Sequence, residues 1–262
     1  MLKSSGPVNV VAVLGLGEAG GIIGRDLVAA GITVRGYDPA VAAPDGIVAA
    51  GSDAEACAGA DLVLSLTTAH EAEGALRASL TGLAPPVLFA DLNTSSADLK
   101  HRLADLAGEH GIAFADVAMM APVPGRGIRT PMLVSGPAAA EVAAALTGLG
   151  GNAEAIEGPA GTAASRKLCR SVFYKGMAAA ITESLRAGRA AGCEDWLRDN
   201  IAEDIGVDMI DRMEKGSVTH AVRRADEMAA ATDMLAELGI PARIAAASRD
   251  WLEQLAKEAA DR

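Results

Sequence analysis

The sequence predicts an α/β chain in which a doubly wound, mostly parallel sheet comes first and an all-helical domain follows. Apolar, β-rich runs alternate with helical patterns as far as residue 156, and the first run leads into a glycine-rich turn. Beyond Gly158 no further run resembles a strand. These observations divide the chain into a sheet domain, residues 1–158, and a helical domain, residues 159–262.

The chain opens with a predicted strand, turn, helix and second strand. Residues 8–14 form an apolar, valine-rich run, which is typical of a strand buried on both faces of a parallel sheet. Glycines follow at positions 15, 17 and 20, and a helical pattern then continues to Gly31. A second strand is predicted over Thr33–Tyr37. This order of elements predicts the Rossmann-type unit that binds a dinucleotide.

Each glycine of the turn has a predicted role. Gly15 allows the tight turn, Gly17 lets the pyrophosphate approach the backbone, and Gly20 lets helix and strand pack closely. The phosphates would lie at the helix N-terminus, where unpaired N–H groups favour an anion. A structural glycine turn is the alternative, but the flanking elements favour a nucleotide site. The predicted phosphate-binding residues are Gly15, Leu16, Gly17, Glu18, Ala19 and Gly20.

The end of the second strand bears on the choice of cofactor. Asp38 follows Tyr37 and lies 18 residues beyond Gly20, where a carboxylate can accept from the ribose hydroxyls. A 2′-phosphate would need a basic residue just after this strand, yet the next one after Arg35 is Arg77. We therefore predict that Tyr37 and Asp38 contact the cofactor and that NAD is preferred over NADP.

The rest of the first domain is predicted to complete a sheet of about eight strands. Further strands are expected near residues 47–48, 61–67, 87–93, 114–117, 132–135 and 153–156. Helices are expected after Ser52 or Asp53 and over residues 70–80. A further helix is expected to carry Leu99, Leu103 and Leu106 on its apolar face. Two strands end in polar residues at the carboxyl edge, so we expect Thr67, Thr68, Asn93 and Thr94 in the cofactor site.

The second domain reads as helices only. A long linker helix is predicted over Thr162–Ala191, with shorter helices near residues 196–201 and 205–213. A further helix is expected over Ser217–Leu238, with Val218, Val222, Ala225, Met228 and Leu235 facing inward, and a last one contains Ile244, Trp251 and Leu255. Because this domain alone would leave its apolar faces partly covered, we predict a homodimer through it.

Composition excludes several classes of protein. The chain has 34 acidic and 23 basic residues, a net charge of −11, which is the wrong sign for a general nucleic-acid binder. The three cysteines, Cys57, Cys169 and Cys193, fit no metal spacing, so we expect buried thiols and no metal site. No apolar stretch is long enough to span a membrane, and the N-terminal residues leave no room for a signal peptide. A cytoplasmic protein is expected.

The predicted linker helix carries a local basic face. No acidic residue occurs between Glu157 and Glu183. Within that interval Lys167, Ser171 and Lys175 are spaced i, i+4, i+8, with Arg166, Arg170 and Tyr174 beside them. A solvated helix flank is the ordinary explanation of such a face. Its place directly after the nucleotide domain favours a role in the site instead.

These motifs resemble the β-hydroxyacid dehydrogenases and the related 6-phosphogluconate dehydrogenase group over most of the chain. GLGEAG is similar to their opening motif, ADLNTSS at residues 90–96 to a second, and GTAASRKLCRS at residues 161–171 to their catalytic-lysine motif. The resemblance implies an NAD(P)-dependent oxidoreductase that transfers a hydride between the nicotinamide and a hydroxy acid or keto acid. Lys167 would be the acid/base, its ammonium form disfavoured by the neighbouring cations.

The departures from the family pattern concern the substrate. The family follows its lysine, four residues later, with an asparagine, and here that position is Ser171. Its Ser-Gly-Gly substrate loop is replaced by a loop that starts at Met119, with the run Met119-Met120-Ala121. We expect the substrate to contact Met119, Met120, Ala121, Arg170, Ser171, Tyr174 and Lys175, and to be a small anion with an apolar portion. The C-terminal run resembles an uncharacterised branch of the superfamily.

Two alternatives to a hydroxy-acid enzyme follow from the same residues. Related folds with an altered lysine neighbourhood reduce C=N bonds, so an imine reductase is one. A non-catalytic NAD-sensing protein is the other, although a sensor has little use for Lys167. His220, Arg223 and Arg224 either complete an anion site from a partner subunit or serve as surface caps and salt-bridge residues.

Overall fold

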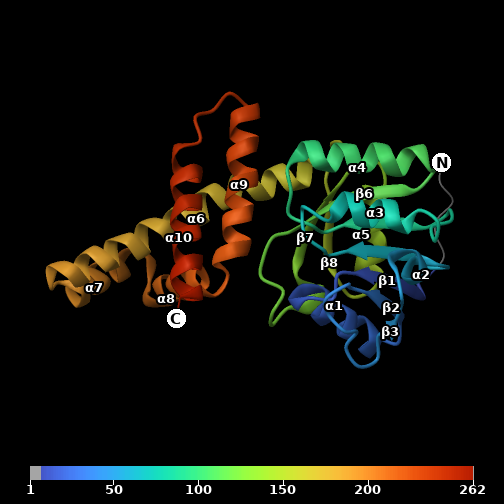
Figure 1. Ribbon diagram of the computed structural model, residues 1–262, viewed down its shortest axis with the longest axis horizontal. Coiled ribbons are helices and arrows are strands. Elements are labelled where there is room, and N and C mark those ends of the chain that lie inside the picture. The colour runs from blue at the N-terminus through green and yellow to red at the C-terminus, as the bar shows by residue number, and fades with distance from the viewer. Residues whose placement is uncertain (1–6, 262) are drawn as a thin grey trace. The chain divides into compact units, whose positions relative to one another are not determined.

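The computed structural model describes residues 7–261, which form two compact units. The first unit ends at Lys167 and the second begins at Leu168. In Figure 1 the first unit is coloured blue to green and contains the sheet, whereas the second is yellow to red and consists of helices. The predicted fold class, a Rossmann-type sheet followed by a helical region, is confirmed.

Within the described residues, the first unit contains an eight-stranded sheet in the order β3-β2-β1-β4-β5-β6-β7-β8. Every neighbouring pair is parallel except β6 and β7, which run antiparallel. The predicted number and mostly parallel direction of the strands are therefore confirmed. The strands are β1 (Val10–Leu14), β2 (Thr33–Tyr37), β3 (Val48–Ala49), β4 (Leu62–Ser65), β5 (Leu88–Asp91), β6 (Ala113–Met119), β7 (Pro131–Ser135) and β8 (Asn152–Ala155).

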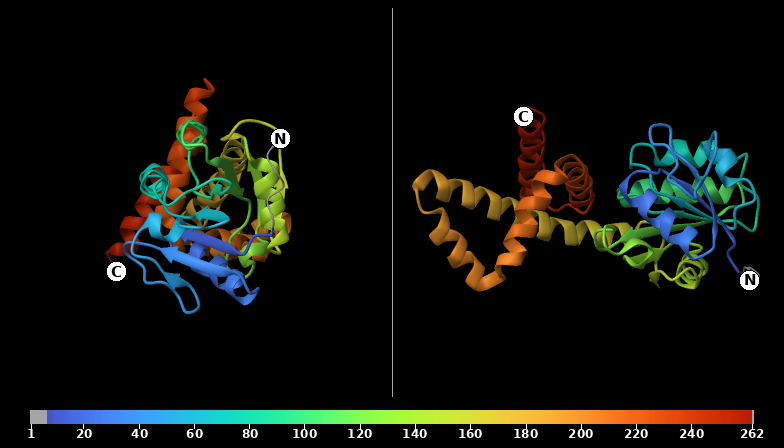
Figure 2. Two further views of the ribbon diagram at one scale, coloured as in Figure 1. Left: turned by 90° about the vertical axis from the view of Figure 1, so that its right-hand side faces the viewer. Right: turned by 90° about the horizontal axis from the view of Figure 1, so that it is seen from below.

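Helices cover both faces of this sheet (Figure 2). They are α1 (Glu18–Ala29), α2 (Asp53–Cys57), α3 (Ala72–Ser79), α4 (Ala97–Glu109) and α5 (Ala139–Gly148), with a short 3₁₀ turn at Gly127–Arg129. One core contains Ile23 and Leu27 of α1 with Leu146 of α5, and the other contains Leu76 of α3 and Leu103 of α4. The sheet is thus doubly wound. No helix is predicted over α5, because its alanine-rich sequence shows little contrast between two faces.

The second unit is built on the C-terminal part of α6 (Thr162–Ala191). The remaining helices are α7 (Glu194–Ile205), α8 (Val207–Thr219), α9 (Ala221–Glu237) and α10 (Arg243–Ala260). Leu168 packs with Met228 of α9 and Leu252 of α10, which lie side by side, whereas Ile181 packs with Ile210 of α8. The bounds of α6 are those predicted.

The prediction of one helix over Ser217–Leu238 is wrong at its start. The helix is interrupted at His220, so residues 217–219 belong to α8 and α9 starts at Ala221. The break shifts the buried stripe of α9 to Ala221, Ala225, Met228, Ala231 and Met234. Val218 and Val222, which were expected to face inward, are 52% and 66% exposed.

The expectation of buried thiols holds for Cys57 and is wrong for Cys169 and Cys193, which are exposed. Leu168 and Val172, one turn apart, face the core of the second unit. Cys169 is one residue further along the helix than Leu168, so it is turned away from that core by about 100°. Among the described helices, none is long and apolar enough to cross a membrane.

Candidate active site

The glycine turn after β1 is fixed by close contacts that exclude larger residues. Gly15 has φ +88°, and a Cβ there would lie 2.4 Å from the carbonyl oxygen of Leu66. A Cβ on Gly20 would lie 1.9 Å from the carbonyl oxygen of Gly15, so helix α1 approaches the turn as closely as the backbone allows. Nothing lies within 4 Å of a Cβ on Gly17, the N-cap of α1, which receives no side-chain cap. This open backbone at a helix N-terminus fits a phosphate group.

Asp38 joins the glycine turn to the loop after β2. Its Oδ2 accepts from the Leu16 N–H at 2.8 Å, and its Oδ1 accepts from the N–H groups of Ala40 at 2.8 Å and Val41 at 3.0 Å. A carboxylate offers about four lone-pair positions, so one remains for a ribose hydroxyl. The preceding Tyr37 accepts from the Gly15 N–H through its backbone carbonyl, at 2.9 Å. Tyr37 and Asp38 therefore both hold the glycine turn in place.

The ends of β4 and β5 bring four polar side chains to the carboxyl edge of the sheet. The Asn93 amide nitrogen lies 3.1 Å from Ser65 Oγ, 3.2 Å from Thr67 Oγ1 and 2.5 Å from Asp91 Oδ1. Asn93 is only 6% exposed, and its Oδ1 has no hydrogen-bond partner among residues 7–261. A buried acceptor without a partner fits a site that receives a donor from a ligand. Thr68 Oγ1 instead accepts from the Glu71 N–H, at 3.2 Å, just before α3.

Helix α6 brings Lys167 to this same edge. Its ammonium nitrogen donates to Thr94 Oγ1 at 2.6 Å, although 73 residues separate the two in sequence. Thr94 directly follows Asn93, and both lie just beyond the end of β5. A lysine and a hydroxyl thus meet where the predicted cofactor residues gather.

A buried ion network lies beneath these residues and was not predicted. Lys100 of α4 is fully buried and pairs with Asp91 Oδ2 at 2.7 Å and Asp116 Oδ1 at 3.1 Å. Burial by itself opposes the charged form, but the two carboxylates outweigh it and raise the pKa of Lys100. In the sequence ADLKHRL, Lys100 looks like a surface residue of an amphipathic helix. The sequence did contain a signal for a buried cation, because Asp91 and Asp116 lie in two strands that are neighbours in the sheet.

In the second unit, Ser171 and Lys175 meet around a residue that the sequence did not single out, Glu227 of α9. Lys175 Nζ lies 3.0 Å from Glu227 Oε1, and the Ser171 hydroxyl donates to the same oxygen. Burial lowers the pKa of Lys175; Glu227 opposes this shift, and Arg224 and Arg170 add to it. Ser171, Lys175 and Glu227 form the Glu227 cluster, which pairs one positive with one negative charge; the neighbouring cations Arg170 and Arg224 add positive charge beside it.

Two further predicted residues have defined contacts near this cluster. The guanidinium of Arg170 lies 4.3 Å from the centre of the Tyr174 ring, a cation–π contact. Arg224 packs on Gly216, where a Cβ would lie 2.3 Å from its guanidinium, and it contacts Ser217 Oγ at 3.4 Å. Burial lowers the pKa of Arg224. His220 lies at the junction of α8 and α9, and Arg223 is exposed.

The predicted substrate loop begins one residue later than expected. Met119 is the last residue of β6, opposite Met132 of β7, because the antiparallel pairing extends through it. Met120 then donates its N–H to the Pro131 carbonyl at 2.8 Å. Met119, Met120 and Ala121 are all half-buried, so they present apolar surface that is neither core nor fully solvated.

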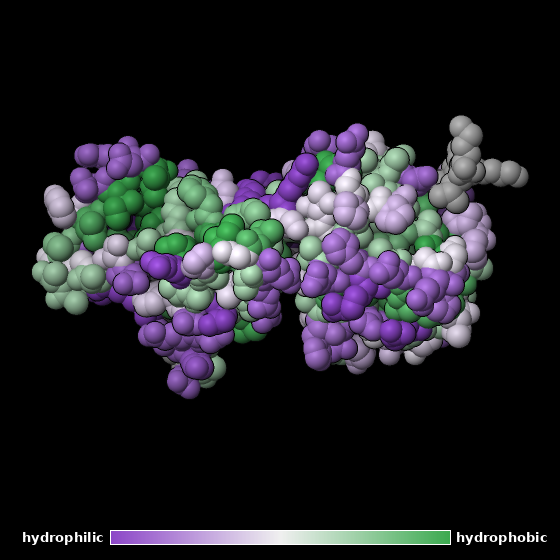
Figure 3. Space-filling model, turned by 90° about the horizontal axis from the view of Figure 1, so that it is seen from above, coloured by the Kyte–Doolittle hydropathy of each residue, from purple (hydrophilic) through white to green (hydrophobic). Residues whose placement is uncertain are grey.

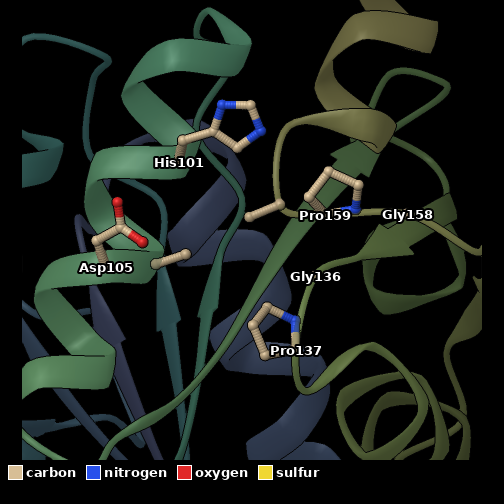
Figure 4. A pocket seen from close by; sticks show the side chains of 8 residues that line it. His101, Asp105, Gly136, Pro137, Gly158 and Pro159 are labelled. Carbon is tan, nitrogen blue, oxygen red and sulfur yellow. The ribbon is translucent and has the colours of Figure 1, made fainter.

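A separate hollow of about 430 Å³ lies beside α4 (Figure 4). His101 and Asp105 of α4 line one side, and the turns at Gly136-Pro137 and Gly158-Pro159 line the other. Both of these α4 side chains are exposed. Across residues 7–261, no group of three or more histidine, cysteine or acidic side chains is placed to hold a metal ion.

Comparison with known proteins matches the first unit to an established family. Residues 10–157 match the model described as the NAD binding domain of 6-phosphogluconate dehydrogenase. The chain belongs to the β-hydroxyacid dehydrogenase superfamily. Residues 189–255 of this β-hydroxyacid dehydrogenase homologue match a domain of unknown function, DUF1932. The predicted family and the NAD-binding character of the first domain are thereby confirmed.

Similar proteins carry dehydrogenase names. A probable 3-hydroxyisobutyrate dehydrogenase of Mycobacterium bovis is 34% identical over 129 residues, which cover 47% of this chain and 44% of that protein. An NAD-dependent L-serine dehydrogenase of Pseudomonas aeruginosa is 29% identical over 210 residues, covering 70% and 65%. The aligned regions thus span between about half and two thirds of these relatives. A structure of Mycobacterium tuberculosis 3-hydroxyisobutyrate dehydrogenase with L-serine, 23% identical, matches with a TM-score of 0.79 over 97% of this chain and 96% of that one, which confirms the fold.

Proposed function

We propose that the protein is an NAD-dependent oxidoreductase that transfers a hydride between the nicotinamide and the hydroxyl-bearing carbon of a small hydroxy acid. The observation that carries this proposal is the 2.6 Å contact between Lys167 Nζ and Thr94 Oγ1, at the sheet edge that also holds the orphaned oxygen of Asn93. The dehydrogenase names of the relatives support the same reaction class.

The residues present fit a nicotinamide dinucleotide. The pyrophosphate would lie at the N-terminus of α1, surrounded by Gly15, Leu16, Gly17, Glu18, Ala19 and Gly20. Tyr37 and Asp38 would lie at the adenosine ribose, and Thr67, Thr68, Asn93 and Thr94 along the carboxyl edge. The bound cofactor supplies the carbon that accepts or donates the hydride. Two observations favour NAD over NADP. Asp38 has a single acceptor position left, and no Lys or Arg lies between Arg35 and Arg77.

Lys167 would exchange the proton that accompanies the hydride. In oxidation its neutral amine takes the proton of the substrate hydroxyl, and in reduction its ammonium returns a proton to the carbonyl oxygen. Thr94 Oγ1 accepts one N–H of Lys167 and thereby limits the directions in which the amine points. A positioned acid/base of this kind is worth about 10²–10⁴ in rate.

The substrate proposed is a small anion with an apolar portion. In the first unit, the half-buried Met119, Met120 and Ala121 offer an adaptable apolar surface. In the second unit, Ser171 and Lys175 of the Glu227 cluster lie close to Arg170, which stacks on Tyr174. The positive charge that Arg170 and Arg224 add beside the cluster suits a carboxylate. The names of the relatives make 3-hydroxyisobutyrate and L-serine the first compounds to test.

We also propose a homodimer formed through the helical unit. Eight of the ten large apolar side chains that are exposed among the described residues belong to this unit: Phe173, Trp196, Val207, Val218, Val222, Leu238, Ile240 and Ile244. Figure 3 shows apolar side chains gathered on one face of that unit. Exposed apolar surface of this kind is typical of a subunit interface.

A titration followed by a turnover screen tests the proposal. Quenching or enhancement of nicotinamide fluorescence measures the Kd for NADH, and the screen then covers 3-hydroxyisobutyrate, L-serine, simple aldehydes and cyclic imines. Turnover of a hydroxy acid that is lost in Lys167→Met supports the dehydrogenase. Turnover of imines alone would identify a C=N reductase, and tight NADH binding with no turnover of any compound would identify a sensor.

A further inference from the structure

The buried Lys100 forms ion pairs with acids of two neighbouring strands. Asp91 and Asp116 lie directly opposite each other in the register of β5 and β6. Lys100 Nζ contacts Asp91 Oδ2 at 2.7 Å, the Asp91 carbonyl oxygen at 3.0 Å and Asp116 Oδ1 at 3.1 Å. The two contacts with Asp91 are hydrogen bonds, and the contact with Asp116 is an ion pair. Two buried carboxylates in adjacent strands would repel each other without this cation.

Asp116 also anchors the first turn of α6. Its second oxygen, Oδ2, accepts from the N–H groups of Gly161 and Ala164, each at 3.0 Å. Ser135 Oγ lies 3.2 Å from the same oxygen and accepts from the Ala163 N–H at 3.0 Å. Three N–H groups at the helix start, which have no partner within the helix, are thus held by β6 and β7. A negative charge at this end also interacts favourably with the helix dipole.

Asp91 connects the network to the other half of the site. Its Oδ1 contacts the Asn93 amide nitrogen at 2.5 Å, and Asn93 directly precedes Thr94. Lys167 follows Ala163 and Ala164 by four and three residues, so it lies on the same side of α6, one turn beyond the anchor. The chain of contacts therefore runs from Thr94 through Asn93, Asp91, Lys100 and Asp116 to the helix that carries Lys167.

We propose that Lys100 and Asp116 are positioning residues for Lys167. By joining the end of β5 to the carboxylate that holds the first turn of α6, they set the distance between Lys167 Nζ and Thr94 Oγ1. Neither residue is assigned a contact with substrate or cofactor. The inference deepens the proposed function, because it rests on Lys167 as the acid/base of that reaction.

Stability alone is a weak reason for such a network. A buried ion triad pays a desolvation cost that its mutual attraction often only balances, and apolar replacements can be equally stable. What an apolar group cannot do is accept two backbone N–H groups and fix the start of a helix at a defined place. The contacts of Asp116 are of this directional kind.

Asp116→Asn is the most informative variant, since it keeps the shape of the side chain and removes the charge. The amide cannot both face Lys100 with an oxygen and accept from Gly161 and Ala164 with the other oxygen. Displacing a catalytic group by about 1 Å can cost about 10²-fold in rate. We therefore expect kcat to fall by about 10–100-fold, with the Kd for NADH changed less than about threefold and the apparent pKa of the kcat profile shifted.

Labelling of lysines measures the same effect without turnover. An amine-reactive reagent is applied over a pH series, and modification of Lys167 is compared with that of the exposed Lys257 by peptide mass spectrometry. In Asp116→Asn the rate at Lys167 should rise relative to Lys257, since the amine is no longer held at Thr94. The matched control is Asp61→Asn. Asp61 also accepts two backbone N–H groups, from Asn9 at 2.8 Å and Val10 at 2.9 Å, but at the amino edge of the sheet.

The outcomes separate the two proposals. Unchanged kcat and unchanged labelling in a folded Asp116→Asn variant would overturn the positioning role. Changed labelling in a protein that turns over no substrate would support positioning and count against the proposed function. If Asp116→Asn does not fold, Ser135→Ala removes one bridging hydroxyl and should move kcat and labelling in the same direction by a smaller factor; no movement there would overturn the inference.

Discussion

Replacing Asp38 by alanine tests the cofactor preference through a residue whose contacts are known. The structure assigns three backbone N–H groups to this carboxylate and leaves one acceptor position for a ribose hydroxyl. A hydrogen bond to a charged group is worth about 1.5–3 kcal/mol, so losing it should weaken NADH by about 10–150-fold. NADPH should be unaffected or bind better, because the carboxylate repels a 2′-phosphate.

The same substitution also has a structural cost that must be measured separately. Ala40 and Val41 are exposed, so water can replace the carboxylate at their N–H groups. Leu16 is buried, and its N–H would be left without a partner at a cost of about 1–3 kcal/mol in the free energy of unfolding. Thermal unfolding therefore accompanies the fluorescence titrations, and Asp45→Ala, an exposed acid in the same loop, controls for net charge. Equal losses for NADH and NADPH would refute the assignment, as would a wild type that binds both equally.

Three further predictions follow from the charges, the apolar loop and the exposed helices. Because the pKa of Lys100 is raised in the fold, its stabilising contribution is present below the unfolded-state value of about 10.4 and is lost as the pH rises through the higher folded-state value. Above about pH 10.4 the unfolding free energy of the wild type should therefore fall more steeply with pH than that of Lys100→Met. Denaturant titrations over a pH series measure this, and the same pH dependence in both proteins would contradict it. Met120→Ala should cost about 1–3 kcal/mol of transition-state binding for an acid with an apolar portion and almost nothing for 3-hydroxypropionate. The measurement is kcat/KM across a panel of acids, and a wild type that prefers 3-hydroxypropionate would contradict the prediction. Light scattering at micromolar concentration should give at least twice the 26.4 kDa chain mass, and a monomer mass would exclude the dimer.

The sequence predicted those elements whose determinants are local. The strand–turn–helix–strand unit is fixed by Gly15, which needs a positive φ, and by Gly20, which tolerates no Cβ, so its spacing is readable in one chain. The bounds of α6 follow from Gly161 at one end and Gly192 at the other, both with positive φ. The role of Lys167, which the family resemblance implies, stays a prediction, and the structure adds its contact with Thr94.

What the sequence did not predict depends on contacts between distant segments. Lys100 looks like a surface lysine until β5 and β6 place Asp91 and Asp116 side by side. Glu227 contacts Lys175 and Ser171 only because α9 packs against α6. The break at His220 separates two helical patterns that are continuous in sequence, so the inward assignment of Val218 and Val222 was wrong.

The substitution Lys167→Met tests the central claim most directly. Methionine keeps the length and helix propensity of the side chain and removes the amine that contacts Thr94. The measurement is kcat for the substrate found in the screen, beside the Kd for NADH. The proposed acid/base role predicts a fall in kcat of about 10²–10⁴ with NADH binding retained. Activity within a few-fold of wild type would contradict it and would make Lys167 an electrostatic anchor, with Lys175, whose pKa burial lowers, as the next residue to test.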